Sequence, residues 1–105
     1  MLKNLNALAK DIYKQAEKSG FWEHPNDGEK IALMHSELSE CLESLRKGTS
    51  PDEHCPSFTN LDIELADVII RILDFVYYKG VDIEKAIEAK MQYNSTRQYK
   101  HGKKF

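Results

Sequence analysis

Two pairs of acidic residues are the first candidates for chemistry in this chain of 105 residues. Glu37 and Glu40 are three residues apart, and after 23 intervening residues Glu64 and Asp67 repeat the spacing. Residues three apart on an α-helix are neighbours on its surface, so each pair occupies one face. If the two helices that carry them pack antiparallel, the four carboxylates face each other across the seam.

Carboxylates gathered near an apolar core repel each other, and partial burial costs several kcal/mol per ion. Such groups must share protons or hold a cation. Coordination by acidic oxygens alone is typical of hard divalent cations, above all Mg²⁺, with Mn²⁺ as a substitute. The sequence therefore predicts a magnesium site formed by Glu37, Glu40, Glu64 and Asp67.

The spacing of other ligand residues argues against two competing metals. Di-iron carboxylate bundles use Glu-x-x-His on two helices, and none of the ten glutamates has a histidine three residues later. The histidines and cysteines show no zinc-ligand spacing. Cys41 and Cys55 form no CxxC pair, so we expect two reduced thiols, with Cys41 in the core.

Apolar periodicity predicts four helices, at about residues 2–19, 26–47, 58–79 and 83–97. Asn26 with Glu29 has capping-box spacing, Asp82 is a predicted N-cap, and a glycine follows each of the first three helices. No segment alternates as a half-buried strand does. The predicted fold is all-α, a four-helix bundle forming one domain over residues 1–105, with a basic tail at 98–105.

The third helix is apolar around most of its circumference, except for a strip about 80° wide. The strip is either a solvent-facing side, supported by an Asp67–Arg71 pair at i, i+4, or the lining of a site. It holds Glu64, Asp67, Arg71 and Asp74. Because three short partners do not easily cover so apolar a helix, we expect assembly with a second protomer, as a homodimer or homotetramer.

The second helix carries an apolar stripe that is predicted to face the core, with Glu37 close to its edge. The stripe consists of Ile31, Met34, Leu38, Cys41, Leu42 and Leu45.

The fourth helix turns from apolar to cationic along one face. Lys90, Asn94 and Arg97 continue the face that begins with Ile83 and Ile87. This arrangement suits an anionic ligand, although the two cations can equally extend to solvent. The basic tail has the same two interpretations.

Trp22, in the connection before the second helix, has two interpretations as well. It either stacks on a nucleobase or caps the hydrophobic core.

Composition limits the classes of partner. The net charge of −2 argues against a surface for nucleic acid polymers, and no apolar stretch approaches the roughly 20 residues of a membrane span. The first ten residues lack the apolar core of a signal peptide, so a cytoplasmic location is expected.

The two acidic pairs, together with Trp22 and the cationic face of the fourth helix, resemble the motifs of the all-α nucleoside triphosphate pyrophosphohydrolases. This is the superfamily of MazG, dimeric dUTPases and phosphoribosyl-ATP pyrophosphohydrolase. The resemblance is to the small, single-domain MazG-like branch and covers roughly residues 20–104. In many relatives two consecutive glutamates open the first acidic motif, whereas Ser36 precedes Glu37 here. The segments of this chain that carry the resemblance are Gly20-Phe21-Trp22, His35-Ser36-Glu37-Leu38-Ser39-Glu40, Glu64-Leu65-Ala66-Asp67-Val68-Ile69, and Lys90-Met91-x-x-Asn94-x-x-Arg97 followed by His101-Gly102-Lys103.

The resemblance implies a MazG-like fold and hydrolysis of a nucleoside triphosphate between its α and β phosphates. It implies that the four acids are the catalytic, Mg²⁺-binding group, one of them serving as general base. Lys90, Asn94 and Arg97 would contact the phosphates and Trp22 the base. The alternative is a non-catalytic helical interaction or regulatory module with an acidic surface.

Overall fold

The computed structural model describes residues 4–105, and within them it contains helices and no β-strand. The elements are α1 (Leu5–Lys18), α2 (Asp27–Lys47), α3 (Asn60–Lys79), α4 (Ile83–Ser95) and a 3₁₀ turn, η1 (Tyr99–Gly102). The all-α class and the four helices are therefore confirmed. The predicted start of the first helix, at residues 2–3, lies outside the described residues.

The starts of α2, α3 and α4 follow from side-chain caps. The side chain of Asn26 accepts a hydrogen bond from the backbone N–H of Glu29 (2.9 Å), and Asp82 caps α4 in the same way, as predicted. A cap that the sequence analysis missed opens α3. Thr59 Oγ1 accepts from the N–H of Asp62 (3.2 Å), and Asp62 Oδ2 accepts from the N–H of Thr59 (3.0 Å). This reciprocal capping box explains why α3 begins at residue 60 rather than 58.

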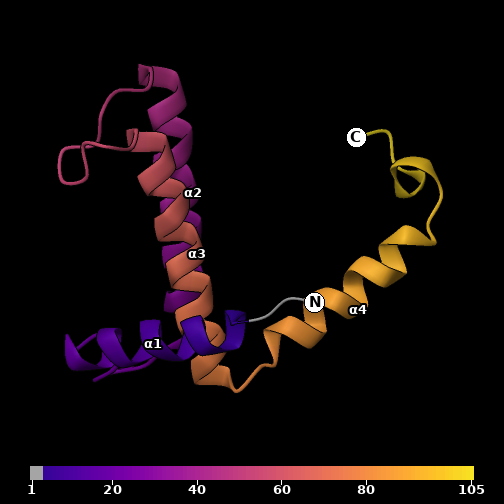
Figure 1. The fold of residues 1–105 in the computed structure, drawn as a ribbon, viewed down its shortest axis with the longest axis horizontal. Helices are drawn as coiled ribbons and strands as arrows, with labels where there is room; N and C mark the ends of the chain where they lie inside the picture. The colour runs from indigo at the N-terminus through magenta and orange to yellow at the C-terminus, as the bar shows by residue number, and fades with distance from the viewer. Residues whose placement is uncertain (1–3) are drawn as a thin grey trace.

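Helices α2 and α3 form an antiparallel hairpin, and α1 crosses its base (Figure 1). The predicted antiparallel packing is confirmed. It places the middle of α2, with Glu37 and Glu40, beside the first half of α3, which carries Glu64 and Asp67.

Helix α4 leaves the other three helices after its first turn (Figure 1). Its start is fixed to α1 by Asn6, whose backbone N–H donates to Glu84 Oε2 (2.7 Å). The side chain of Asn6 donates to Asp82 Oδ1 (2.9 Å) and accepts from the N–H of Ile83 (3.1 Å). These bonds anchor one end only, and the rest of the helix points outward. Within one chain α1–α3 pack together and α4 projects, so the predicted four-helix bundle is not closed by a single chain.

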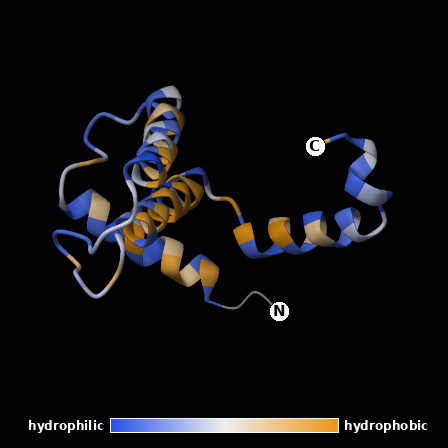
Figure 2. Ribbon diagram, turned by 90° about the horizontal axis from the view of Figure 1, so that it is seen from above, coloured by the Kyte–Doolittle hydropathy of each residue, from blue (hydrophilic) through white to orange (hydrophobic). Residues whose placement is uncertain are grey.

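The projecting helix makes the chain large for its length. The radius of gyration is 16.2 Å, against about 13 Å for a compact domain of this size. The accessible surface of 8154 Å² exceeds by about 2,000 Å² the area expected for a folded monomer of this mass. Apolar residues lie along the hairpin and along the isolated α4 (Figure 2). The buried apolar side chains are few: Ala9, Trp22, Cys41, Val68, Leu73 and Val76.

The face of α2 that packs against α3 differs from the predicted one. Cys41 and Ser44 are buried, and the side chain of Glu37 is only 13% exposed. Leu38 and Leu42, predicted to face the core, are each about half exposed (51% and 52%). Helix α3 packs on the face of α2 that holds Glu37, Cys41 and Ser44. The leucine stripe of α2, formed by Leu38, Leu42 and Leu45, is therefore left uncovered within this chain. The prediction that the whole stripe packs inside its own chain is wrong.

Two further expectations concern thiols and membranes. Cys41 is buried and Cys55 exposed, and both are free thiols. In the part of the chain that the structure describes, no helix combines the length and the apolar character needed to cross a membrane.

Candidate functional site

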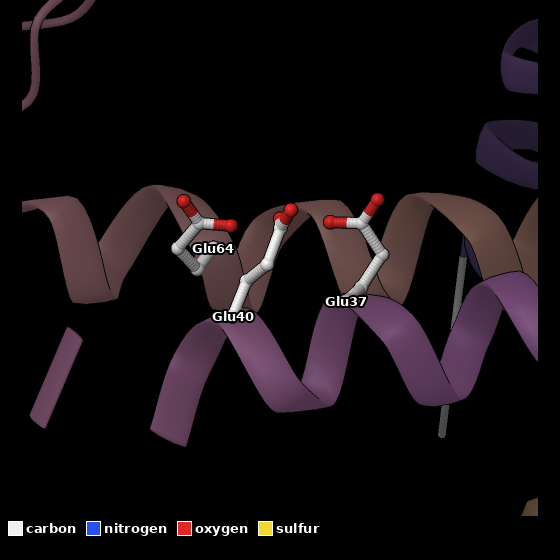
Figure 3. A group of neighbouring side chains, drawn as sticks. All are labelled: Glu37, Glu40 and Glu64. Carbon is white, nitrogen blue, oxygen red and sulfur yellow. The ribbon is translucent and has the colours of Figure 1, made fainter. Parts of the chain in front are cut away.

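Three of the four predicted acids converge between α2 and α3. Glu37, Glu40 and Glu64 each contribute a carboxylate oxygen, and these three atoms all lie within 4.8 Å of one another. In Figure 3 the two carboxylates from α2 and the one from α3 line up, with Glu40 in the middle. The three-residue spacing places Glu37 and Glu40 on one face of α2, and the antiparallel hairpin brings Glu64 to that face.

Glu64 is the most constrained member of this acid group. Its Oε2 is inaccessible to solvent and has no hydrogen-bond partner. Burial raises the pKa of Glu64 to about 7, helped by a hydrogen bond with Glu40 and by the negative charges of Glu40, Asp67 and Glu37. A buried polar oxygen without a partner is rare and costly. A proton or a cation bound at this oxygen would remove that cost.

Asp67 lies beside this group rather than within it. Burial raises its pKa, the charge of Glu37 raises it further, and the charge of Arg71 opposes the shift. Of the four predicted acids, three carboxylates therefore converge. The fourth, Asp67, lies close enough for their negative charge to raise its pKa.

A cleft of about 360 Å³ adjoins the acid group. Glu37 belongs to both, so a ligand in the cleft would contact the acid group through this residue. An exposed aromatic ring, Phe21, and two cations, Lys30 and Arg71, also lie in the cleft wall. The full lining is Ile12, Gln15, Ala16, Ser19, Phe21, Lys30, Glu37, Asp67, Ile70, Arg71 and Asp74.

The partner of Arg71 is Glu37, a pairing that was not predicted. Its Nε donates to Glu37 Oε1 at 2.8 Å, from α3 to α2. The predicted alternative, an Asp67–Arg71 pair on a solvent-facing strip, is not the arrangement found. Asp67, Arg71 and Asp74 line the cleft instead. The sequence signal that points to Arg71 is its place as the one cation in the strip that also holds Glu64, Asp67 and Asp74.

Trp22 is buried, with 8% of its surface exposed. Its Nε1 donates to Asp74 Oδ1 (2.9 Å), and its ring stacks on Tyr78 with centroids 4.2 Å apart. Lys30 Nζ lies 4.2 Å from the centre of the same ring. These contacts favour the packing interpretation over the stacking of Trp22 on a base. Its neighbour Phe21, 63% exposed, is the aromatic ring available in the cleft.

Helix α4, which carries Lys90 and Asn94 of the predicted cationic face and is followed by Arg97, projects away from the α2–α3 hairpin of its own chain (Figure 1). Lys90 Nζ and Arg97 Cζ lie 4.8 Å and 5.3 Å from the ring centre of Tyr93. Asn94 Oδ1 is buried without a hydrogen-bond partner. Within one chain the structure does not bring Lys90, Asn94 and Arg97 to the acids.

The raised pKa of Glu64 predicts a pH dependence of stability for the metal-free protein. Between its ordinary value of 4.5 and about 7, the folded state binds this proton more tightly than the unfolded state. Stability should therefore fall as the pH rises through this interval and level off above it. Urea unfolding in the presence of a chelator, at pH values from 4.5 to 8, measures this slope. Glu64→Gln should flatten it, and an equal slope in both proteins would contradict the assignment.

Comparisons with protein-family models, with curated proteins and with solved structures give no match for this chain. Over residues 4–105 the chain is a small all-α protein of four helices, with the acid group between α2 and α3.

Proposed function

We propose that the protein is a Mg²⁺-dependent nucleotide pyrophosphohydrolase, which cleaves a nucleoside triphosphate between its α and β phosphates. The observation that carries the proposal is the convergence of Glu37, Glu40 and Glu64 around a buried oxygen that has no partner. The sequence motifs shared with the all-α pyrophosphohydrolases supply the reaction and the substrate class.

The donor set fits a hard divalent cation. All its atoms are carboxylate oxygens from two helices that are packed together, and Mg²⁺ and Mn²⁺ prefer such ligands. When bound, the cation would neutralise phosphate charge and make a water molecule more nucleophilic. Glu37, Glu40 and Glu64 would hold it, with Asp67 as the fourth acid beside them, and one of the four acids would serve as the general base.

The cleft offers what a nucleotide needs beside such a cation. Phe21 presents an exposed aromatic face for a base or sugar, and Arg71 and Lys30 present positive charge. The alternative, an acidic surface for a basic partner, is less favoured because Glu37 and Glu64 are turned inward rather than displayed.

A second copy of the chain completes the proposed enzyme. The excess surface of about 2,000 Å² on one chain is more than the roughly 800 Å² that each partner buries in an interface of standard size. The leucine stripe of α2 and the projecting α4 provide surface for that contact. In such a homodimer or homotetramer, Lys90, Asn94 and Arg97 of one chain serve the phosphates held at the acid group of another.

A panel of normal and modified nucleoside triphosphates tests the reaction. With Mg²⁺, the protein should release pyrophosphate and the nucleoside monophosphate from at least one of them, and a chelator should stop the release. Mg²⁺ alone should raise the melting temperature, since it binds only the folded state. No release from any triphosphate, together with no thermal shift, would exclude the proposal.

Mixing two inactive variants tests whether the site is shared between chains. Glu64→Ala and Arg97→Ala should each be inactive alone. After joint unfolding and refolding, mixed oligomers contain some sites with an intact acid group and an intact α4, so part of the activity should return. The control is a mixture of Glu64→Ala with Glu40→Ala, whose defects fall in the same acid group. Equal inactivity of both mixtures would show that α4 does not act across chains.

A further inference from the structure

We propose that Arg71 is a binding residue for a phosphate group of the ligand, held on Glu37 until a divalent cation takes that carboxylate. This inference deepens the proposed function and rests on it. It adds a phosphate contact from within the chain, separate from the one proposed for α4.

The geometry leaves most of the Arg71 side chain available. Only its Nε is engaged, by Glu37 Oε1, and within residues 4–105 its two terminal nitrogens donate no hydrogen bond. The side chain is 35% exposed and lies in the wall of the cleft. A guanidinium presents a planar fork of donors that matches two phosphate oxygens.

Lys30, the other cation in the cleft, already makes two contacts through its ammonium group. Its Nζ donates to the backbone carbonyl of Phe21 at 2.8 Å and lies over the ring of Trp22. Of the two cations, Arg71 is the one that keeps a planar pair of donor nitrogens without a hydrogen bond.

Glu37 links the acid group to Arg71. One of its oxygens belongs to the group of three carboxylates, and its Oε1 accepts from Arg71. A divalent cation at the acid group and the guanidinium would both draw on the negative charge of this one carboxylate. We expect a bound cation to weaken the ion pair at Nε, so that the whole guanidinium beside the cleft can turn to a phosphate of the cation-bound ligand. Only hydrogen bonds and ionic contacts are exchanged.

Two calorimetric titrations test the exchange, with Mg²⁺ alone and with inorganic pyrophosphate at saturating Mg²⁺. Arg71→Gln should bind Mg²⁺ several-fold more tightly, because a competing cation is gone. It should bind pyrophosphate roughly 10-fold or more weakly, because charge-assisted hydrogen bonds are lost. Arg71→Lys should lose pyrophosphate affinity although it keeps the charge. Arg46→Gln, which removes an exposed arginine at the end of α2, is the matched control and should bind both as the parent does.

A second experiment does not depend on the metal site. Glu37→Gln removes the negative charge that holds Arg71, so without any metal it should bind pyrophosphate more tightly than the parent. Adding Arg71→Gln should reverse the gain by roughly 10-fold, whereas adding Arg46→Gln should leave it unchanged. Circular dichroism of each variant checks that it is folded.

The outcomes separate this inference from the proposed function. If the parent hydrolyses nucleotides but Arg71→Gln binds Mg²⁺ and pyrophosphate as the parent does, Arg71 is only an ion-pair partner and the inference is wrong. Weaker Mg²⁺ binding by Arg71→Gln would also overturn it, since Arg71 would then position Glu37 rather than compete for it. If the parent neither binds Mg²⁺ nor hydrolyses nucleotides, the proposed function fails, and the metal-free titrations decide on Arg71 alone.

Discussion

Replacing Glu64 with glutamine is expected to lower the rate of pyrophosphate release on the order of 10³-fold. The substitution removes the acid that α3 contributes to the group of three and leaves the shape of the side chain almost unchanged. A metal ligand of this kind supplies several kcal/mol of charge stabilisation in the transition state. The measurement is kcat/KM over a range of Mg²⁺ concentrations, on the best substrate of the panel.

Glu43→Gln is the matched control, because Glu43 lies on α2 one turn beyond Glu40 but is about half exposed and is paired with Lys47. It should retain parental activity. Without metal at neutral pH, Glu64→Gln should unfold at the same or a higher urea concentration than the parent, since the repulsion among the three carboxylates is relieved. Near-normal turnover by Glu64→Gln at saturating Mg²⁺ would falsify the metal assignment.

Replacing Trp22 with alanine is expected to lower the free energy of unfolding by about 3–4 kcal/mol, typical of a buried tryptophan. The substitution removes a ring packed against Tyr78 and the hydrogen bond to Asp74. Burial already raises the pKa of Asp74, and loss of the indole donor would leave its carboxylate partly desolvated without that hydrogen bond. Urea unfolding followed by circular dichroism, at one fixed protein concentration, measures the loss without relying on Trp22, the only tryptophan in the chain.

Two neighbouring substitutions separate packing from ligand binding. Trp22→Phe keeps an aromatic ring but loses the donor, so it should cost about 1–2 kcal/mol. Phe21→Ala, at a residue 63% exposed, should change stability little and raise KM if the ring contacts the substrate. A large increase in KM for Trp22→Ala with unchanged stability would instead restore the interpretation that Trp22 stacks on a base.

Features that depend on neighbours along the chain could be predicted from the sequence. Helix-forming periodicity and the caps at Asn26 and Asp82 act within one or two turns, so the elements and most of their ends were predictable. The placement of Glu37 with Glu40 on one face is likewise local, because three residues nearly complete a helical turn. The short loop after α2 made the antiparallel hairpin, and with it the approach of Glu64, a reasonable expectation.

Which helix faces meet depends on contacts between segments far apart in the chain and could not be predicted. The apolar stripe of α2 suggested that its leucines are buried, whereas α3 packs on the face with Glu37, Cys41 and Ser44. Hydrophobic burial has no direction, so an amphipathic pattern does not say whether the same chain or a second copy covers a face. The partner of Arg71, on another helix, could not be read from its i, i+4 neighbours for the same reason. The direction of α4 depends on the bonds of Asn6, 77 residues before Ile83, and no local rule specifies a contact at that separation.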